Sequence, residues 1–196
     1  MVLSDVDIKR YIAAGKIKIT PELPPEQFGS CSVDFRLGNE FSVFEYSRHP
    51  YIDLKDKGSI QGSLQDIMRK VVVPDGESFV LQPRDFVLAI TEETLDLSTD
   101  ILGRLEGRSS LGRIGIIVHG TAGLFDPGWI GKATLELSNL SRMAVALYPG
   151  MRICSFTFEQ VSTPVSVSYR DKPNNKYAGQ TSPLASKLVS EVSGRG

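Results

Sequence analysis

Short runs of β-branched, aromatic and aliphatic residues recur along most of this sequence, and Gly, Pro, Asp or Asn separates them. The runs lie at residues 71–73, 79–81, 86–91, 101–105, 114–118, 132–137, 144–148 and 153–158. Each is too short for a helix, and nothing in their order suggests alternating strands and helices. The pattern therefore predicts an all-β protein, either a closed barrel or a double-sheet jelly roll.

The first third of the chain adds two strands and two helices to this prediction. Ser4 followed by Asp7 resembles a capping box, and Gly15 stands where a helix would stop, so we expect a short N-terminal helix between them. Residues 31–37 alternate with period two, and residues 41–46 are rich in aromatic and β-branched side chains, so both are predicted strands. Residues 63–70 are expected to form a second short helix.

The size and composition of the chain favour one globular unit. It has 196 residues, of which 41% are apolar and 23% are charged. We therefore expect a single domain over residues 1–196. From about Arg170 the sequence becomes polar, so residues 170–196 should form a C-terminal tail that is disordered unless something it touches orders it.

The charge pattern restricts the partners of the protein. A net charge of −1 leaves no basic field for a nucleic-acid duplex, so an anionic partner should be small. No run approaches the roughly 18 apolar residues of a membrane span. The opening residues carry no apolar leader. We expect a soluble, cytoplasmic protein that binds neither nucleic acid nor membranes.

Cysteines and histidines are too few and too scattered to form a disulfide scaffold or a zinc cluster. Cys31 and Cys154 are isolated, and His49 and His119 are the only histidines. Both cysteines are expected to be small buried side chains.

The loop from Gly107 to Arg113 is the first candidate for chemistry. It places two hydroxyls and two guanidiniums beside glycines, and backbone N–H groups at the start of a short helix would add anion-binding donors. Its spacing matches neither a P-loop nor a dinucleotide fingerprint. The residues alone leave two interpretations open, a phosphate site or a solvated surface turn.

The segment from residue 132 to 138 is the second candidate. Strand alternation puts Ala133, Leu135 and Leu137 on one face. Thr134 and Glu136 then share the other face, where the carboxylate is either merely solvated or part of a site.

Several motifs taken in order closely resemble the dCTP deaminases of the trimeric dUTPase superfamily, over nearly the whole chain. The resemblance begins at Leu3-Ser4-Asp5-x-Asp7-Ile8 and Val33-Asp34-x-Arg36-Leu37-Gly38, and continues through the loop 107–113, His119-x-Thr121-Ala122-Gly123, Asp126-Pro127-Gly128, Thr134-Leu135-Glu136, Lys176-Tyr177 and Gln180. It implies a distorted jelly-roll β-barrel of the dUTPase-like type. It also implies a homotrimer with sites between subunits, over which the tail closes.

The resemblance implies hydrolytic deamination of dCTP at C4 of the cytosine, without zinc. The sequence independently lacks the His- or Cys-x-Glu and Pro-Cys-x-x-Cys pattern of the zinc deaminases. By motif position, Glu136 is the group that takes a proton from the attacking water and delivers one to the base. Ser109 and Arg113, from a neighbouring subunit, and the backbone of Ala122 would complete the catalytic set.

The same resemblance implies the contacts to the rest of the nucleotide. Asp126 would accept the 3′-hydroxyl of the deoxyribose, and Trp129 would pack against the sugar and disfavour a 2′-hydroxyl. The other implied substrate-binding residues are Arg108, Ser110, Leu111, Gly112, His119, Thr121, Thr134, Leu135, Tyr169, Lys176, Tyr177 and Gln180. Magnesium would be held by the triphosphate and not by protein ligands. Besides dCTP, nucleotides of the dUTP and dTTP type are also expected to bind.

Three alternatives stay open at this point. The product is dUTP, or a bifunctional enzyme continues to dUMP and pyrophosphate, or the barrel senses nucleotide without turnover. Gly123-Leu124 resembles the small-then-apolar pair of dUMP-forming members, whereas Ser155 stands where those members often have Gln. A plain dUTPase is disfavoured because its glycine-rich C-terminal motif is replaced by residues 176–180.

Overall fold

The computed structural model describes residues 1–45, 51–52 and 67–188. Most of the described residues in regular structure are strands, which confirms the all-β prediction. The elements in chain order are α1 (Asp5–Ala13), β1 (Ile17–Thr20), η1 (Pro25–Gln27), β2 (Val33–Phe44), β3 (Met68–Val72), β4 (Phe79–Leu81), β5 (Phe86–Leu97), β6 (Ile101–Gly107), α3 (Ser109–Gly112), β7 (Ile116–Ile117), β8 (Leu124–Phe125), β9 (Ile130–Asn139), β10 (Val145–Leu147), β11 (Arg152–Gln160) and η2 (Tyr169–Asp171).

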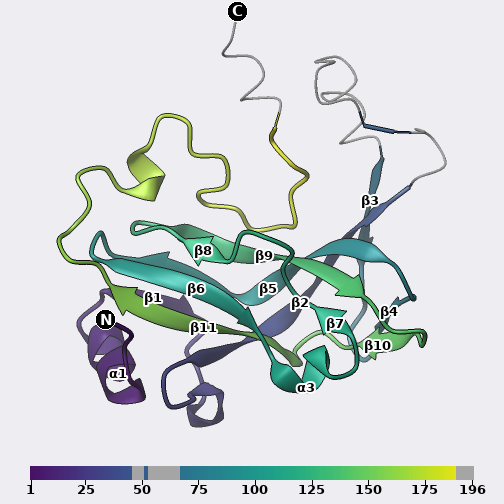
Figure 1. Cartoon of the computed structure of the whole chain (residues 1–196), viewed down its shortest axis with the longest axis horizontal. Helices are drawn as coiled ribbons and strands as arrows, with labels where there is room; N and C mark the ends of the chain where they lie inside the picture. Colours follow the sequence, from purple (N-terminus) through teal and green to yellow (C-terminus); the bar gives the residue numbers. More distant parts are fainter. Residues whose placement is uncertain (46–50, 53–66, 189–196) are drawn as a thin grey trace, which may run out of the picture.

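One curled antiparallel sheet makes up most of the fold (Figure 1). Its strand order is β7-β9-β5-β2-β11-β6-β8, while β1 adds to β5 and β3 adds to β2. β4 and β10 form a second, two-stranded sheet. The long strands β5 and β9 pair along most of their length, so β9 is firmly held where it carries the candidate carboxylate.

The core lies inside the curl of the sheet and is rich in aromatic rings. Phe35 and Phe156 are completely buried, with ring centroids 4.6 Å apart. Phe125 packs edge-on against Phe156 at 4.9 Å and against Trp129 at 4.8 Å. This row of rings connects the centre of the barrel to the turn that carries Asp126 and Trp129.

The N-terminal helix forms as predicted. The Ser4 side chain accepts a hydrogen bond from the Asp7 N–H, and Gly15 after the helix has φ +71°, a backbone conformation that suits glycine. Within the described residues, no helix has the length and apolar character needed to cross a membrane.

Several local predictions are corrected by the structure. Residues 31–37 and 41–46 are not two strands, because β2 runs unbroken from Val33 to Phe44 with an irregular register between Leu37 and Phe41. Of the predicted strand 114–118, only Ile116–Ile117 pairs. Cys31 is exposed because it precedes the first buried residue of β2, whereas Cys154 is buried as expected.

The helix predicted at residues 63–70 is wrong where it can be compared. Met68 to Lys70 belong to β3, and Met68 pairs with Phe44 of β2. Pairing with a neighbouring strand overrides the local pattern here. Residues 63–66 of that prediction lie outside the described part of the chain.

Candidate active site

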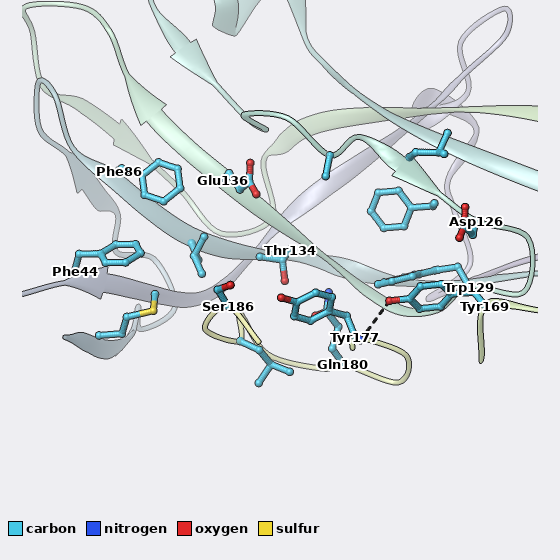
Figure 2. Close-up of a pocket in the computed structure, with 16 residues that line it drawn as sticks. Phe44, Phe86, Asp126, Trp129, Thr134, Glu136, Tyr169, Tyr177, Gln180 and Ser186 are labelled. Atoms are coloured by element: carbon cyan, nitrogen blue, oxygen red, sulfur yellow. Dashed lines mark hydrogen bonds between the residues drawn. The ribbon is translucent and has the colours of Figure 1, made fainter. Parts of the chain in front are cut away.

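A pocket of about 410 Å³ opens between β9, the segment that follows Gly120 and the C-terminal tail (Figure 2). It is lined by Phe44, Met68, Phe86, Leu88, Ala122, Leu124, Phe125, Asp126, Trp129, Thr134, Glu136, Tyr169, Tyr177, Gln180, Leu184 and Ser186. Eight of the residues predicted from the sequence are in this set, namely Ala122, Asp126, Trp129, Thr134, Glu136, Tyr169, Tyr177 and Gln180.

Glu136 reaches the pocket because β9 alternates strictly. Ala133, Leu135 and Leu137 are fully buried in the core, so Thr134 and Glu136 face the other way. The Gly120 N–H donates to Oε2 of Glu136 at 2.7 Å, and the Glu136 N–H donates to the Val118 carbonyl at 2.9 Å. The loop 118–120 thus binds Glu136 at two points, the side-chain carboxylate and the backbone N–H.

The turn Asp126-Pro127-Gly128-Trp129 forms the opposite end of the pocket. The Trp129 N–H donates to the Asp126 carbonyl at 3.0 Å, and Gly128 has φ +83°. The ring of Trp129 is stacked at a tilt on Tyr169, with centroids 5.1 Å apart. Nζ of Lys172 lies 3.0 Å from the Asp126 carboxylate. The Asp126 carboxylate and the rings of Trp129 and Tyr169 therefore lie at the same end of the pocket.

The tail forms the third wall and is attached to β9 through its backbone. The Gly179 N–H donates to the Ile130 carbonyl at 2.8 Å, and the Lys132 N–H donates to the Gln180 carbonyl at 2.9 Å. Nε2 of Gln180 donates to the Lys132 carbonyl at 2.8 Å. These contacts attach the described part of the tail to β9.

The predicted residues around α3 lie outside the pocket as far as the chain is described. Ser109, Ser110, Gly112 and Arg113 are exposed on or beside α3, and Leu111 is packed beneath them. Figure 1 shows α3 below the sheet, whereas the tail runs above it. A single chain therefore does not bring these residues to Glu136.

Four further predicted residues, namely Leu135, His119, Thr121 and Lys176, do not line the pocket. Leu135 is fully buried in the core, so only its backbone could reach a ligand. His119 and Thr121 flank Gly120, whose N–H binds Glu136, and Nδ1 of His119 is buried without a partner among the described residues. Lys176 lies in the tail between Tyr169 and Tyr177, two residues that do line the pocket.

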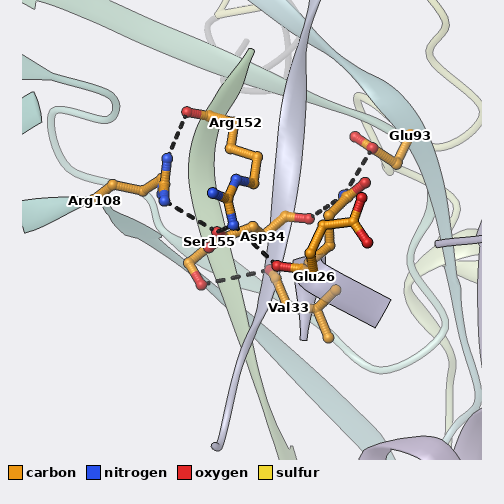
Figure 3. Close-up of polar contacts among 8 residues, drawn as sticks. Glu26, Val33, Asp34, Glu93, Arg108, Arg152 and Ser155 are labelled. Carbon is orange, nitrogen blue, oxygen red and sulfur yellow. Dashed lines mark hydrogen bonds and ion pairs between the residues drawn. The ribbon is translucent and has the colours of Figure 1, made fainter. Parts of the chain in front are cut away.

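Arg108 belongs to a polar cluster at the base of β2 and β11 (Figure 3). Its Nη2 lies 3.3 Å from the Asp34 carboxylate, and its Nη1 donates to the Arg152 carbonyl at 3.1 Å. Nη1 of Arg152 also lies 3.3 Å from Asp34, so two guanidiniums share one carboxylate. The hydrogen bond to the buried Glu93 raises the pKa of Arg36 next to this cluster. Arg108 is thus held in place, and is not a freely solvated surface residue.

Sequence reasoning missed the apolar end of the pocket. Phe44 of β2 and Phe86 of β5 have ring centroids 5.5 Å apart, and Met68 and Leu88 lie beside them. Leu184 and Ser186 of the tail were also missed. The four strand residues come together only through the register of β2 with β3 and β5, which no local pattern encodes.

A sequence model of the family described as dCTP deaminase-like matches residues 2–161. The chain belongs to this family. The match covers every described strand and α3, and leaves the tail outside it.

Two relatives of this dCTP deaminase-like chain carry different names. A protein of Thermomicrobium roseum named dCTP deaminase is 60% identical over 98% of this chain and 96% of its own length. A protein of Dictyoglomus thermophilum named dCTP deaminase, dUMP-forming, is 48% identical over 96% of this chain and 95% of its own length.

Among solved structures, the crystal structure of 2′-deoxycytidine 5′-triphosphate deaminase from Agrobacterium tumefaciens has a similar fold. The TM-score is 0.63 at 22% identity, over 81% of this chain and 48% of that chain. The chain therefore shares the mainly β fold of a protein named as a dCTP deaminase.

Proposed function

We propose that the protein converts dCTP and water to dUTP and ammonia, with Glu136 as general acid and base. The observation that carries this proposal is the place of Glu136, which lines the same pocket as Asp126 and Trp129 and is held at Oε2 by the Gly120 N–H. Family membership and relatives named dCTP deaminase support it.

In the proposed reaction, Glu136 takes a proton from water while the water oxygen bonds to C4 of cytosine. The carboxyl group returns this proton to N3 of the base and then carries the proton of the new C4 hydroxyl to the amino group. The C4–N bond breaks, ammonia leaves, and C4 keeps the new oxygen as a carbonyl. The half-buried position of Glu136 limits competing solvent. Proton transfer of this kind typically contributes about 10²–10⁴-fold to a rate.

The substrate is proposed to be the magnesium complex of dCTP. Among the described residues no three His, Cys, Asp or Glu side chains converge on one point, so the phosphate oxygens are the better ligands for the ion. The ion would partly neutralise the triphosphate.

We propose that the protein is a homotrimer in which a neighbouring subunit supplies the predicted residues around α3, Ser109 and Arg113 among them, to the site. Ser109 and Arg113 are exposed, and α3 lies on a different side of the chain from the tail, so a neighbouring subunit could present them to Glu136. Arg108 would face the phosphates with its guanidinium already oriented by Asp34.

Glu136→Gln tests the proposal most directly. We expect the amide to preserve fold and dCTP binding while turnover falls at least about 10²-fold, because it cannot exchange the proton. Glu106→Gln, an exposed glutamate on β6, is the matched control and should keep wild-type turnover. Near wild-type deamination by Glu136→Gln would refute the mechanism.

A second candidate is the bifunctional reaction that continues to dUMP and pyrophosphate. It is favoured by the Gly123-Leu124 pair and by relatives named dUMP-forming. Ser155 and the name of the Thermomicrobium roseum relative favour dUTP release. Incubation with dCTP and Mg²⁺ followed by chromatographic separation of dCTP, dUTP and dUMP distinguishes the two reactions. Nucleotide binding with no product would instead indicate a non-enzymatic sensor.

A further inference from the structure

Arg170, in η2 at the root of the tail, binds the turn at the sugar end of the pocket without lining the pocket itself. Its Nε donates to the Gly128 carbonyl at 2.8 Å, and its Nη2 donates to the Trp129 carbonyl at 3.2 Å. The same Nη2 donates to the Leu97 carbonyl at 3.1 Å and to the Asp96 carboxylate. One guanidinium therefore joins the tail, the turn 126–129 and the end of β5.

Other contacts at this junction show how closely the tail and the turn are fitted. The Tyr169 N–H donates to the Pro127 carbonyl at 2.9 Å. A Cβ on Gly128 would lie 2.4 Å from Cβ of Ser168, so the two segments approach as closely as a glycine allows. A shift of the tail root thus forces a shift of the turn.

The residues on both sides of this junction make up one end of the pocket. Figure 2 shows Asp126, Trp129 and Tyr169 gathered there. Their positions depend on the backbone carbonyls that Arg170 binds, since Trp129 itself supplies one of them. The planar fork of an arginine can serve several acceptors at fixed angles, which the single ammonium of a lysine cannot.

We propose that Arg170 is a positioning residue for recognition of the deoxyribose. It sets the separation between the Asp126 carboxylate and the rings of Trp129 and Tyr169, and through them the preference for dCTP over CTP. The inference rests on the proposed function, because it takes the sugar of dCTP to lie at this end of the pocket.

The test compares Arg170→Lys with the wild-type chain on dCTP and CTP. Lysine keeps the charge but loses the fork, so we expect KM for dCTP to rise about tenfold, kcat to change far less, and the preference for dCTP over CTP to fall about tenfold. Asp96→Asn is the second variant, and it leaves the guanidinium in place but weakens one of its contacts. We expect it to raise KM for dCTP and lower the preference for dCTP over CTP by less than Arg170→Lys does. It tests the same inference if Arg170→Lys folds poorly.

Arg104→Lys is the matched control. Arg104 is likewise partly exposed and bridges two strands, with its Nε 2.5 Å from the Glu159 carboxylate, but it does not line the pocket. It should leave KM and nucleotide preference unchanged. If Arg170→Lys only lowers the melting temperature and both parameters stay at wild-type values, the positioning role is overturned.

Binding of dCTP and CTP measured by calorimetry separates this inference from the proposed function. A wild-type chain that binds dCTP in preference to CTP but does not deaminate it would refute the proposed function, while the effect of Arg170→Lys on binding still tests the inference. A wild-type chain that binds neither nucleotide would overturn both.

Discussion

Thr134 carries a buried hydroxyl oxygen with no hydrogen-bond partner among the described residues, and it faces the pocket beside Glu136. A buried polar group left unpaired costs about 1–3 kcal/mol, so this hydroxyl makes sense where a ligand completes its bonding. A nucleotide that offers this hydroxyl a hydrogen bond would complete its bonding.

Thr134→Val should separate stability from binding. Valine has nearly the same shape without the hydroxyl, so we expect the free energy of unfolding of the free protein to rise by about 1 kcal/mol while the Kd for dCTP increases several-fold. Urea unfolding and calorimetry measure the two quantities.

Thr91→Val is the contrasting control for that experiment. The Thr91 hydroxyl is buried but satisfied, since it donates to the Glu93 carbonyl at 2.8 Å and accepts from the Ala133 N–H at 2.9 Å. Its loss should destabilise the protein. A destabilised Thr134→Val with unchanged dCTP affinity would mean that the hydroxyl has no role in the pocket.

At the scale of single residues, the sequence predicts orientation well where one strand decides it. The period of two along residues 132–138 places Glu136 and Thr134 on the face opposite Leu135, and the structure agrees. Cys31 shows the limit, because burial at the start of a strand depends on where pairing begins. The burial of Cys154 raises the pKa of its thiol, which suits the apolar role predicted for it.

At the scale of elements, the turn after β8 depends on a glycine for two separate reasons. Gly128 has φ +83°, and any Cβ there would collide with Ser168. Gly150 has the same φ of +83°, but a Cβ there would meet nothing within 4 Å. Substituting each of the two glycines therefore separates the effect of backbone strain, which both share, from that of steric collision, which only Gly128 has.

Gly128→Ala and Gly150→Ala form a matched pair. Gly150→Ala should cost about 1–2 kcal/mol of stability, the usual penalty for a left-handed alanine. Gly128→Ala should cost more and should also weaken dCTP binding, because the tail root and the turn must separate. Equal losses in the two variants, with equal dCTP affinity, would show that the contact with Ser168 has no effect.

The strands were largely predictable because hydrophobic alternation is local. Their boundaries and their pairing partners were not. β2 continues through the Gly38 region where two strands were expected, since neighbouring β5 pairs with both of its halves. The predicted helix at 63–70 fails at Met68 for the same reason, because β2 offers it a pairing partner. The apolar end of the pocket was missed because Phe44 and Phe86 meet only across strands.

At the scale of the whole molecule, the predicted site residues fall into two groups that one chain keeps apart. Glu136, Asp126 and the tail residues share the pocket, whereas Ser109 and Arg113 are exposed at α3. Resemblance to a family supplied both groups, but spacing along the chain could not reveal that they are separated in space. A closed homotrimer in which each α3 faces the next subunit's pocket would unite them.

Subunit mixing tests this arrangement. Glu136→Gln and Arg113→Ala chains should each be inactive alone, because every site then lacks one required group. After joint unfolding and reassembly at equal amounts, a site that takes Glu136 from one chain and Arg113 from its neighbour is intact in about a quarter of cases. We therefore expect activity to return to roughly that fraction of the wild-type value. Mass measurement of the reassembled trimers, with one variant tagged, verifies that the chains have mixed, and mixing without unfolding is the control. If mixed trimers form and no activity returns, Glu136 and Arg113 do not act across a subunit boundary.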